Sequence, residues 1–234
     1  MGKIIPVKGT RKVIAERMVE SHLVSPDATH FVQVDMTNEQ RFRKELSEKH
    51  GRKISANVIF AKIAAKTLSE FPYVNASYIS GNNGSDDYIE LHDEINIGIA
   101  VAVNSGVLVV NIRDCDKKSF VETADDFERL LDASKNNKLT IDDITGSTFV
   151  ITSMAIARDV VFHIPIINQP NLAIMGVYRP QDTPVAVDGE IVIRPMMYLS
   201  LVTDHRVIDG VMTGEFIARL KYYLLHPEEI DNRM

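Results

Sequence analysis

The sequence is poor in residues that cross-link a chain or anchor it in a membrane. Cys115 is the only cysteine among 234 residues, which excludes an internal disulfide and a metal site built from cysteines. This usage fits a reducing compartment best. No apolar stretch approaches the length of a membrane span, and residues 1–6 lack the pattern of a signal peptide. We therefore expect a cytoplasmic protein without membrane contact.

Positive charge is scarce as well, with 26 Lys and Arg residues against 32 Asp and Glu residues and a formal net charge of -6. General binding to nucleic acid needs a basic surface for phosphate contacts, so we do not expect it. An anionic ligand would need a local cluster of lysines and arginines. Histidines and carboxylates also lack the spacing of a metal site, so no bound metal is expected.

What is present is an ordinary globular composition, with 45% hydrophobic and 25% charged residues and no repeat or flexible linker. The chain is long enough for one large core, and we expect a single domain over residues 1–234. Periodicity predicts helices at 11–24, 37–50, 55–71, 119–136 and 211–226. It predicts strands at 30–36, 74–79, 88–91, 95–103, 107–112, 148–152, 171–178, 185–193 and 196–202. Helices collected early and strands collected late indicate an α+β fold, with a mixed sheet and helices packed on one side.

Short sequence signals predict several element ends. Thr37 and Ser119 each begin a capping box, with Gln or Glu three residues later. Residues 188–189, Asp-Gly, predict a two-residue hairpin turn, and residues 104–106 predict a second hairpin. The first helix, 11–24, is expected to be amphipathic, with a basic and an apolar face.

The segment most suggestive of chemistry is 204–210, Asp-His-Arg-Val-Ile-Asp-Gly, between a buried strand and an amphipathic helix. His205 is the leading candidate for a general base, because it titrates near neutrality and packed elements fix it on both sides. The alternative is a structural histidine beside a capping aspartate. Asp209 could orient His205, but the short spacing favours a structural role in which it binds a backbone amide or an arginine.

Thr152 and Ser153 are two hydroxyls at the end of a predicted strand. Neither has the glycine-flanked elbow of a hydrolase serine. Either could donate a hydrogen bond to a developing oxyanion, or could simply bond its own backbone. Among the other histidines, His30 and His163 could also be buried near a site.

A series of motifs resembles the catalytic domain of the dihydrolipoyl acyltransferases, the core component of 2-oxo acid dehydrogenase complexes. The resemblance covers nearly all of residues 8–229. The matching segments include RKVIAERM at 11–18, FPYVNAS at 71–77, INIGIAVA at 95–102 and DHRVIDG at 204–210, with shorter ones at 29–31, 34–37, 112–114, 166–170, 188–192 and 195–197. Their order along the chain makes chance an inadequate explanation.

The resemblance implies a chloramphenicol acetyltransferase-like fold and a reaction. His205 is implied to take the proton from the thiol of coenzyme A, or of dihydrolipoamide in reverse. Thr152 falls on the family's oxyanion-binding serine, and Asp209 is implied to organise the site. Coenzyme A is then a substrate, and another domain supplies the lipoyl group. No metal is implied.

The resemblance also implies partners. Family members form trimers, so His205 and Thr152 of neighbouring subunits would share one site, and trimers assemble into polyhedral cores through C-terminal contacts. Ile230 and Met234 are the apolar side chains of this tail. Further implied partners are a lipoyl domain, a decarboxylase and dihydrolipoamide dehydrogenase. No lipoyl or subunit-binding domain is recognised here, so we expect the catalytic core of a longer protein rather than a stand-alone protein.

Two departures keep alternatives open. Threonine replaces the family serine at Thr152, with Ser153 next to it on the opposite strand face, and Ala155 replaces a glycine. The chain could therefore be a structural scaffold with little catalysis, or a small-molecule acetyltransferase of the same fold. A serine hydrolase is the weakest alternative.

Neither the acyl group nor the basic residues that would bind coenzyme A can be read from the sequence. The basic candidates are Arg11, Lys12 and Arg17, Lys62 and Lys66, and Arg113, Lys117 and Lys118.

Overall fold

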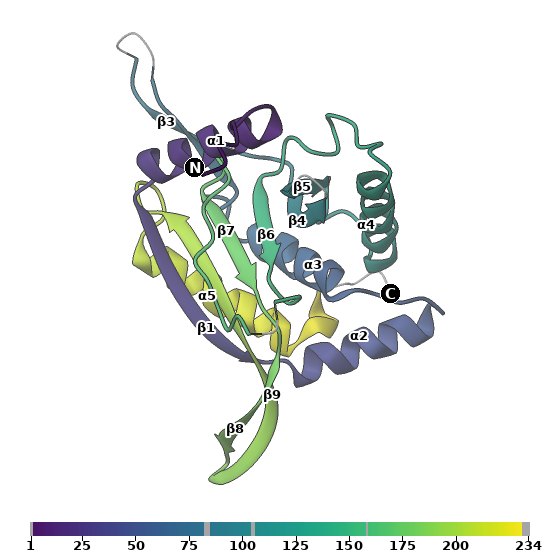
Figure 1. Ribbon diagram of the computed structural model, residues 1–234. Coiled ribbons are helices and arrows are strands. Elements are labelled where there is room, and N and C mark those ends of the chain that lie inside the picture. The colour runs from purple at the N-terminus through teal and green to yellow at the C-terminus, as the bar shows by residue number, and fades with distance from the viewer. Residues whose placement is uncertain (1, 82–84, 104–105, 158, 231–234) are drawn as a thin grey trace.

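The computed structural model describes residues 2–81, 85–103, 106–157 and 159–230 (Figure 1). The turn expected at 104–105, part of the turn at 82–84, and Met234 lie outside these ranges. The helices are α1 (Thr10–Val24), α2 (Thr37–Lys49), α3 (Ala56–Leu68), α4 (Phe120–Lys135), α5 (Gly210–Leu225) and the 3-10 helix η1 (Pro227–Glu229). The strands are β1 (Asp27–Asp35), β2 (Ala76–Ile79), β3 (Tyr88–Leu91), β4 (Ile97–Val103), β5 (Gly106–Ile112), β6 (Phe149–Ser153), β7 (Ala173–Val177), β8 (Gln181–Val187) and β9 (Glu190–Asp204).

A mixed sheet organises the molecule, as the sequence predicted. Its strand order is β1-β9-β7-β6-β4-β5, with β8 paired to β9. The pairs β4–β6 and β6–β7 are parallel and the others are antiparallel. Strands β2 and β3 form a separate hairpin that projects beside α1, whereas the β8–β9 hairpin extends from the opposite end (Figure 1).

The two faces of the sheet are covered differently. Helices α2 to α5 pack together, and α3, α4 and α5 contact strands of the sheet, so the main apolar core lies on this face. On the other face a smaller cluster joins Val150, Ile174 and Val202 to Ile167, which belongs to the segment after β6. Helix α1 is anchored to that segment, because the Ser21 hydroxyl donates to the Ile167 carbonyl over 2.6 Å.

The apolar side of α1 is only partly buried within the chain. Val13 and Val19, which the sequence pattern placed on an apolar face, are 50% and 60% exposed. The predicted helix is present, and its apolar face is covered only in part, since Ile14 and Met18 are half-buried. Across those residues, no helix combines the length and apolar character needed to cross a membrane.

The last long strand differs from its prediction. The sequence suggested a strand ending at 193 and another beginning at 196, on either side of Pro195. The structure has one 15-residue strand, β9. Pro195 lies in register with Asp182 of β8, and its carbonyl accepts the Met36 N–H over 2.9 Å, so pairing continues past the proline. The predicted Asp-Gly turn is confirmed, with φ of 51° at Asp188 and 86° at Gly189.

Of the two predicted capping boxes, one is confirmed and one is wrong. At α4, the Glu122 N–H donates to Ser119 Oγ and the Ser119 N–H donates to the Glu122 carboxylate. At α2, Thr37 instead donates both its N–H and its hydroxyl to Asp35 Oδ1, over 2.9 and 2.6 Å. The Thr37 hydroxyl is therefore engaged outside the helix, and the N-cap residue is Met36, without a side-chain bond.

Candidate functional site

His205 lies on the short loop between the end of β9 and the start of α5, as predicted. Its side chain is exposed, whereas its backbone is held: the His205 N–H donates to the Pro26 carbonyl over 3.0 Å. The N–H groups of Val207 and Ile208 donate to the Asp204 carbonyl over 3.1 and 3.0 Å. An accessible imidazole on a fixed backbone is the arrangement that a general base requires.

The residues on either side of His205 form an ion pair that the sequence analysis did not anticipate. Arg206 Nε donates to Asp204 Oδ1 over 3.0 Å, and Nη2 donates to Oδ2 over 2.6 Å. Asp204 is fully buried, and this hydrogen-bonded carboxylate raises the pKa of the Arg206 guanidinium. The Arg206 N–H also donates to Asp204 Oδ1. The pair thus closes the turn around His205, and its only sequence signal was opposite charges flanking the histidine.

Asp209 is the N-cap of α5, where its Oδ1 accepts the Met212 N–H over 2.8 Å. This is the backbone-amide role that the short spacing favoured. The arginine-binding carboxylate of this loop is Asp204. Asp209 therefore fixes the beginning of the helix, and Asp204 fixes the turn before it.

Thr152 and Ser153 end β6 on opposite faces of the sheet, as expected from strand alternation. Thr152 lies on the same face as Val150, and Ser153 on the helix-covered face with Ile151. Ser153 lines a 320 Å³ cavity together with residues such as Phe60 and Tyr178. Both hydroxyl-bearing residues are half-buried.

The structure does not bring Thr152 and His205 together within one chain. Thr152 is in register with Gly176 of β7, which is in register with Ser200 of β9. His205 follows Ser200 by five residues, which corresponds to about 16 Å along an extended strand. The two candidate groups therefore lie toward opposite ends of the strands.

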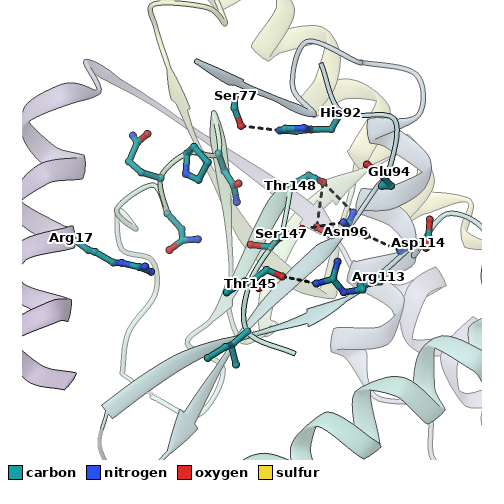
Figure 2. A pocket seen from close by; sticks show the side chains of 16 residues that line it. Arg17, Ser77, His92, Glu94, Asn96, Arg113, Asp114, Thr145, Ser147 and Thr148 are labelled. Atoms are coloured by element: carbon teal, nitrogen blue, oxygen red, sulfur yellow. Dashed lines mark hydrogen bonds between the residues drawn. The ribbon is translucent and has the colours of Figure 1, made fainter. Parts of the chain in front are cut away.

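A polar cavity of 610 Å³ opens where β4, β6 and β7 begin (Figure 2). Ser77 Oγ and His92 Nε2 lie 2.8 Å apart on its wall. Asn96 links its sides, because its N–H donates to Thr148 Oγ1 over 3.1 Å and its Oδ1 accepts the Asp114 N–H over 2.9 Å. Arg17 approaches this cavity from α1. Sequence reasoning gave Ser77 and His92 no role together.

The basic candidates for an anionic ligand do not form one cluster. Arg17 and Arg113 line the polar cavity, and Arg113 Nη2 donates to the Thr145 carbonyl over 3.2 Å. Lys62 is 4% exposed and donates to the Cys115 carbonyl, so it is not available on the surface. The remaining pairs are Lys12–Glu16, Lys66–Glu70, Lys117–Asp114 and Lys118–Asp126.

Two further histidines were considered near a site. His163 is half-buried, which lowers the pKa of its imidazole, and its carbonyl accepts the Tyr178 hydroxyl over 2.6 Å. His30 is half-buried in β1.

No group of three or more His, Cys, Asp or Glu side chains is arranged to hold a metal ion among residues 2–81, 85–103, 106–157 and 159–230.

Comparison with known proteins agrees with this geometry. The family described as 2-oxoacid dehydrogenases acyltransferase (catalytic domain) matches residues 2–231, so the chain belongs to that family. The dihydrolipoyllysine-residue succinyltransferase component of the 2-oxoglutarate dehydrogenase complex of Haemophilus influenzae is 35% identical over 232 residues. The match covers 97% of this chain and 55% of that relative, so the chain spans about half of the relative's length.

Solved structures of similar proteins have the same fold. The dihydrolipoamide acetyltransferase of Azotobacter vinelandii, studied for the roles of a serine, a histidine and an asparagine in its catalytic mechanism, has a TM-score of 0.89 and 32% identity, covering 98% of this chain and 94% of that chain. The cubic core of a pyruvate dehydrogenase multienzyme complex has a TM-score of 0.87 and 32% identity, with the same coverage. A chloramphenicol acetyltransferase, at 15% identity and a TM-score of 0.56 over 96% of this chain and 100% of that chain, shares the fold alone. The expected fold class is confirmed.

Proposed function

We propose that this chain is the catalytic core of a dihydrolipoamide acyltransferase, which moves an acyl group between the dihydrolipoyl thiol and coenzyme A with His205 as general base. The observation that carries the proposal is the exposed His205 imidazole on a loop tied to Pro26 and closed by the Asp204–Arg206 pair. Membership of an acyltransferase family supplies the reaction class.

The reaction needs a base because a thiol with a pKa of about 8.5 is only a few per cent ionised at neutral pH. His205 accepts the proton of the attacking thiol, and the thiolate forms a carbon–sulfur bond to the carbonyl carbon of the acyl thioester. The tetrahedral oxyanion then collapses, the original carbon–sulfur bond breaks, and the departing thiolate recovers a proton from His205. Base catalysis of this kind contributes on the order of 100- to 10,000-fold.

A hydroxyl at the end of β6 is proposed to bind the oxyanion, with Thr152 first in line because it holds the family serine's place in the motif. Ser153 needs a parallel test. In the Azotobacter vinelandii protein, the histidine and the asparagine are separated as His205 and Asp209 are, whereas its serine precedes the histidine by the spacing of Ser153 rather than Thr152. Loss of one such donor costs about 3 kcal/mol of transition-state stabilisation.

The proposed active unit is a homotrimer in which His205 of one subunit meets Thr152 of its neighbour. Its support is the separation of the two residues within one chain, since a shared site then requires a second subunit. We propose further that trimers assemble into a polyhedral core, by analogy with the cubic core described for a similar protein. A lipoyl domain, a decarboxylase and dihydrolipoamide dehydrogenase are the proposed partners.

The substrates are proposed to be coenzyme A thioesters and a lipoyl group carried by another domain. Cytoplasmic location is part of the proposal, because the single Cys115 is buried and forms no disulfide, as suits a reducing compartment.

The acyl group that is transferred is one of three candidates: acetyl, branched-chain or succinyl. One methylene in a pocket changes binding by only about 1–3 kcal/mol, so the difference must be measured.

The test is acyl transfer from acetyl, isobutyryl and succinyl coenzyme A to free dihydrolipoamide. His205→Ala should lower kcat by about 100- to 10,000-fold. His50→Ala is the matched control, since His50 is an exposed histidine at the end of α2. Absence of transfer to any acceptor, from protein shown to be a folded trimer or larger shell, would overturn the proposal in favour of a structural scaffold.

A further inference from the structure

A stacked pair joins the loop that carries His205 to the β2–β3 hairpin. The Cζ atom of Arg206 lies 3.9 Å from the centroid of the Tyr78 ring, within the range of a cation–π contact. The same guanidinium is hydrogen-bonded edge-on to the buried Asp204 carboxylate. Arg206 is thus held along its edge by Asp204 and on its face by Tyr78.

The far end of the Tyr78 ring is also fixed. Its hydroxyl donates to Asp87 Oδ2, while the Gly81 N–H donates to Asp87 Oδ1 over 2.9 Å. This hydrogen bond raises the pKa of Tyr78 and lowers that of Asp87, because it favours the phenol and the carboxylate. Tyr78 also packs in part against the main core. The ring therefore presents a defined face to Arg206.

The hairpin itself is tied to the strand beside β9. Ser77 forms an isolated antiparallel bridge with Asn171, and the Asp204 N–H donates to the carbonyl of the next residue, Leu172, over 2.8 Å. The hairpin and the end of β9 are therefore both attached to the same short stretch before β7. The β2–β3 hairpin is therefore attached to the same stretch of chain as the histidine loop.

We infer that Tyr78 is a positioning residue for His205, acting through the Arg206–Asp204 pair. The inference rests on the proposed function of His205 for its catalytic consequence. Without the ring, one face of the Arg206 guanidinium is exposed to water and its side chain gains rotational freedom. Because Arg206 directly follows His205, greater mobility of Arg206 also increases the mobility of the His205 backbone, which sets the orientation of the imidazole.

Steady-state acyl transfer by the assembled protein tests this with three variants. Tyr78→Leu removes the ring and should lower kcat by about 2- to 30-fold, the range of a cation–π contact, with KM for the acyl donor changed less than about twofold. Tyr78→Phe keeps the ring face and should retain most of kcat. Tyr88→Leu, at a tyrosine of the same hairpin that is 56% exposed, is the control.

A double-mutant cycle shows whether Tyr78 acts through Arg206. Lysine cannot offer a planar face, so Tyr78→Leu should have little further effect on kcat in an Arg206→Lys background. Fully additive effects would overturn the inference. So would a kcat for Tyr78→Leu equal to that of Tyr88→Leu.

A readout without turnover separates this inference from the proposed function. Carbethoxylation of His205 by diethyl pyrocarbonate, followed by mass spectrometry, reports the freedom of the imidazole even if wild-type protein transfers no acyl group. We expect the His205 rate to rise at least about twofold in Tyr78→Leu but not in Tyr78→Phe. The exposed His50 is the internal reference. An unchanged His205 rate in Tyr78→Leu would overturn the positioning role whatever the activity.

Discussion

Two carboxylates, those of Asp204 and Asp209, fix different parts of the loop that carries His205. Asp204 is buried and takes the Arg206 guanidinium, whereas Asp209 is exposed and caps α5. Sequence reasoning singled out Asp209 and gave Asp204 no role. Asp204 ends β9 and Arg206 lies in the turn that follows, and the sequence analysis did not single out this pair. Only the turn that follows β9 brings the two side chains into contact, so this pair required the structure.

Cys115 carries a testable consequence of burial. It is fully buried, and burial raises the pKa of its thiol to about 12. Since the thiolate is the reactive form, the folded protein should not react with iodoacetamide at pH 8, whereas urea-unfolded protein should react at one site. Mass spectrometry measures both. Alkylation at comparable rates in the two states would contradict the burial.

The same shift predicts a pH dependence of stability. The folded thiol holds its proton more tightly than the unfolded thiol, whose usual pKa is 9.0. The associated stability is fully present below pH 9 and is lost as the pH rises toward about 12. Urea unfolding of wild type and Cys115→Ala should therefore show a free-energy difference that shrinks above pH 9, and a constant difference would contradict this linkage.

At the scale of elements, the sequence predicted correctly those features in which the interacting residues are close together in the sequence. The Ser119 capping box and the Asp-Gly turn at 188–189 involve only neighbouring residues, and both were predicted correctly. The Thr37 box was wrong because Asp35, two residues upstream, takes the Thr37 hydroxyl. The strand β9 was predicted as two strands, one ending at 193 and one beginning at 196. Its continuity depends on Met36 and β8, which lie far away in sequence.

The N-cap of α5 allows a prediction about this element. Asp209→Ala removes the acceptor of the Met212 N–H and should lower the free energy of unfolding by about 0.5–2 kcal/mol. Asp209→Asn keeps a good capping side chain and should remain close to wild type in stability and in acyl transfer. Urea unfolding and steady-state kinetics measure the two effects. A loss of transfer in Asp209→Asn with unchanged stability would show that the carboxylate charge acts in catalysis.

At the scale of the whole molecule, the fold class followed from the order of helices and strands, but the distribution of the site did not. Strand periodicity places Thr152 at the end of β6, but it does not determine which residue of β9 lies level with Thr152. The register of β6, β7 and β9 determines this residue, because it aligns Thr152 with Gly176 and Ser200 rather than with the end of β9. The exposure of Val13 and Val19 on α1 likewise did not follow from the sequence pattern, which placed both on an apolar face.

A site shared between subunits makes a quantitative prediction for mixed assemblies. His205→Ala and Thr152→Val subunits should each be nearly inactive alone, since one lacks the base and the other lacks the oxyanion donor. In a cyclic trimer, each site takes His205 from one subunit and the hydroxyl from the next. Random mixing of equal amounts should therefore restore about one quarter of wild-type activity in the whole mixture, and about one third in the hybrid trimers, each of which has one complete site out of three. Co-expression with two different affinity tags, followed by purification through both, selects the hybrids.

The control is the same two variants purified separately and combined without subunit exchange, which should show only their residual activities. The mixture with Ser153→Ala in place of Thr152→Val identifies the donor, because only the hydroxyl that truly binds the oxyanion gives an inactive parent and a reactivated hybrid. Activity in the hybrids no higher than the sum of the parents would place both groups in one subunit. Because the β register sets them about 16 Å apart along the sheet, that result would require the end of β6 or the His205 loop to move before acyl transfer.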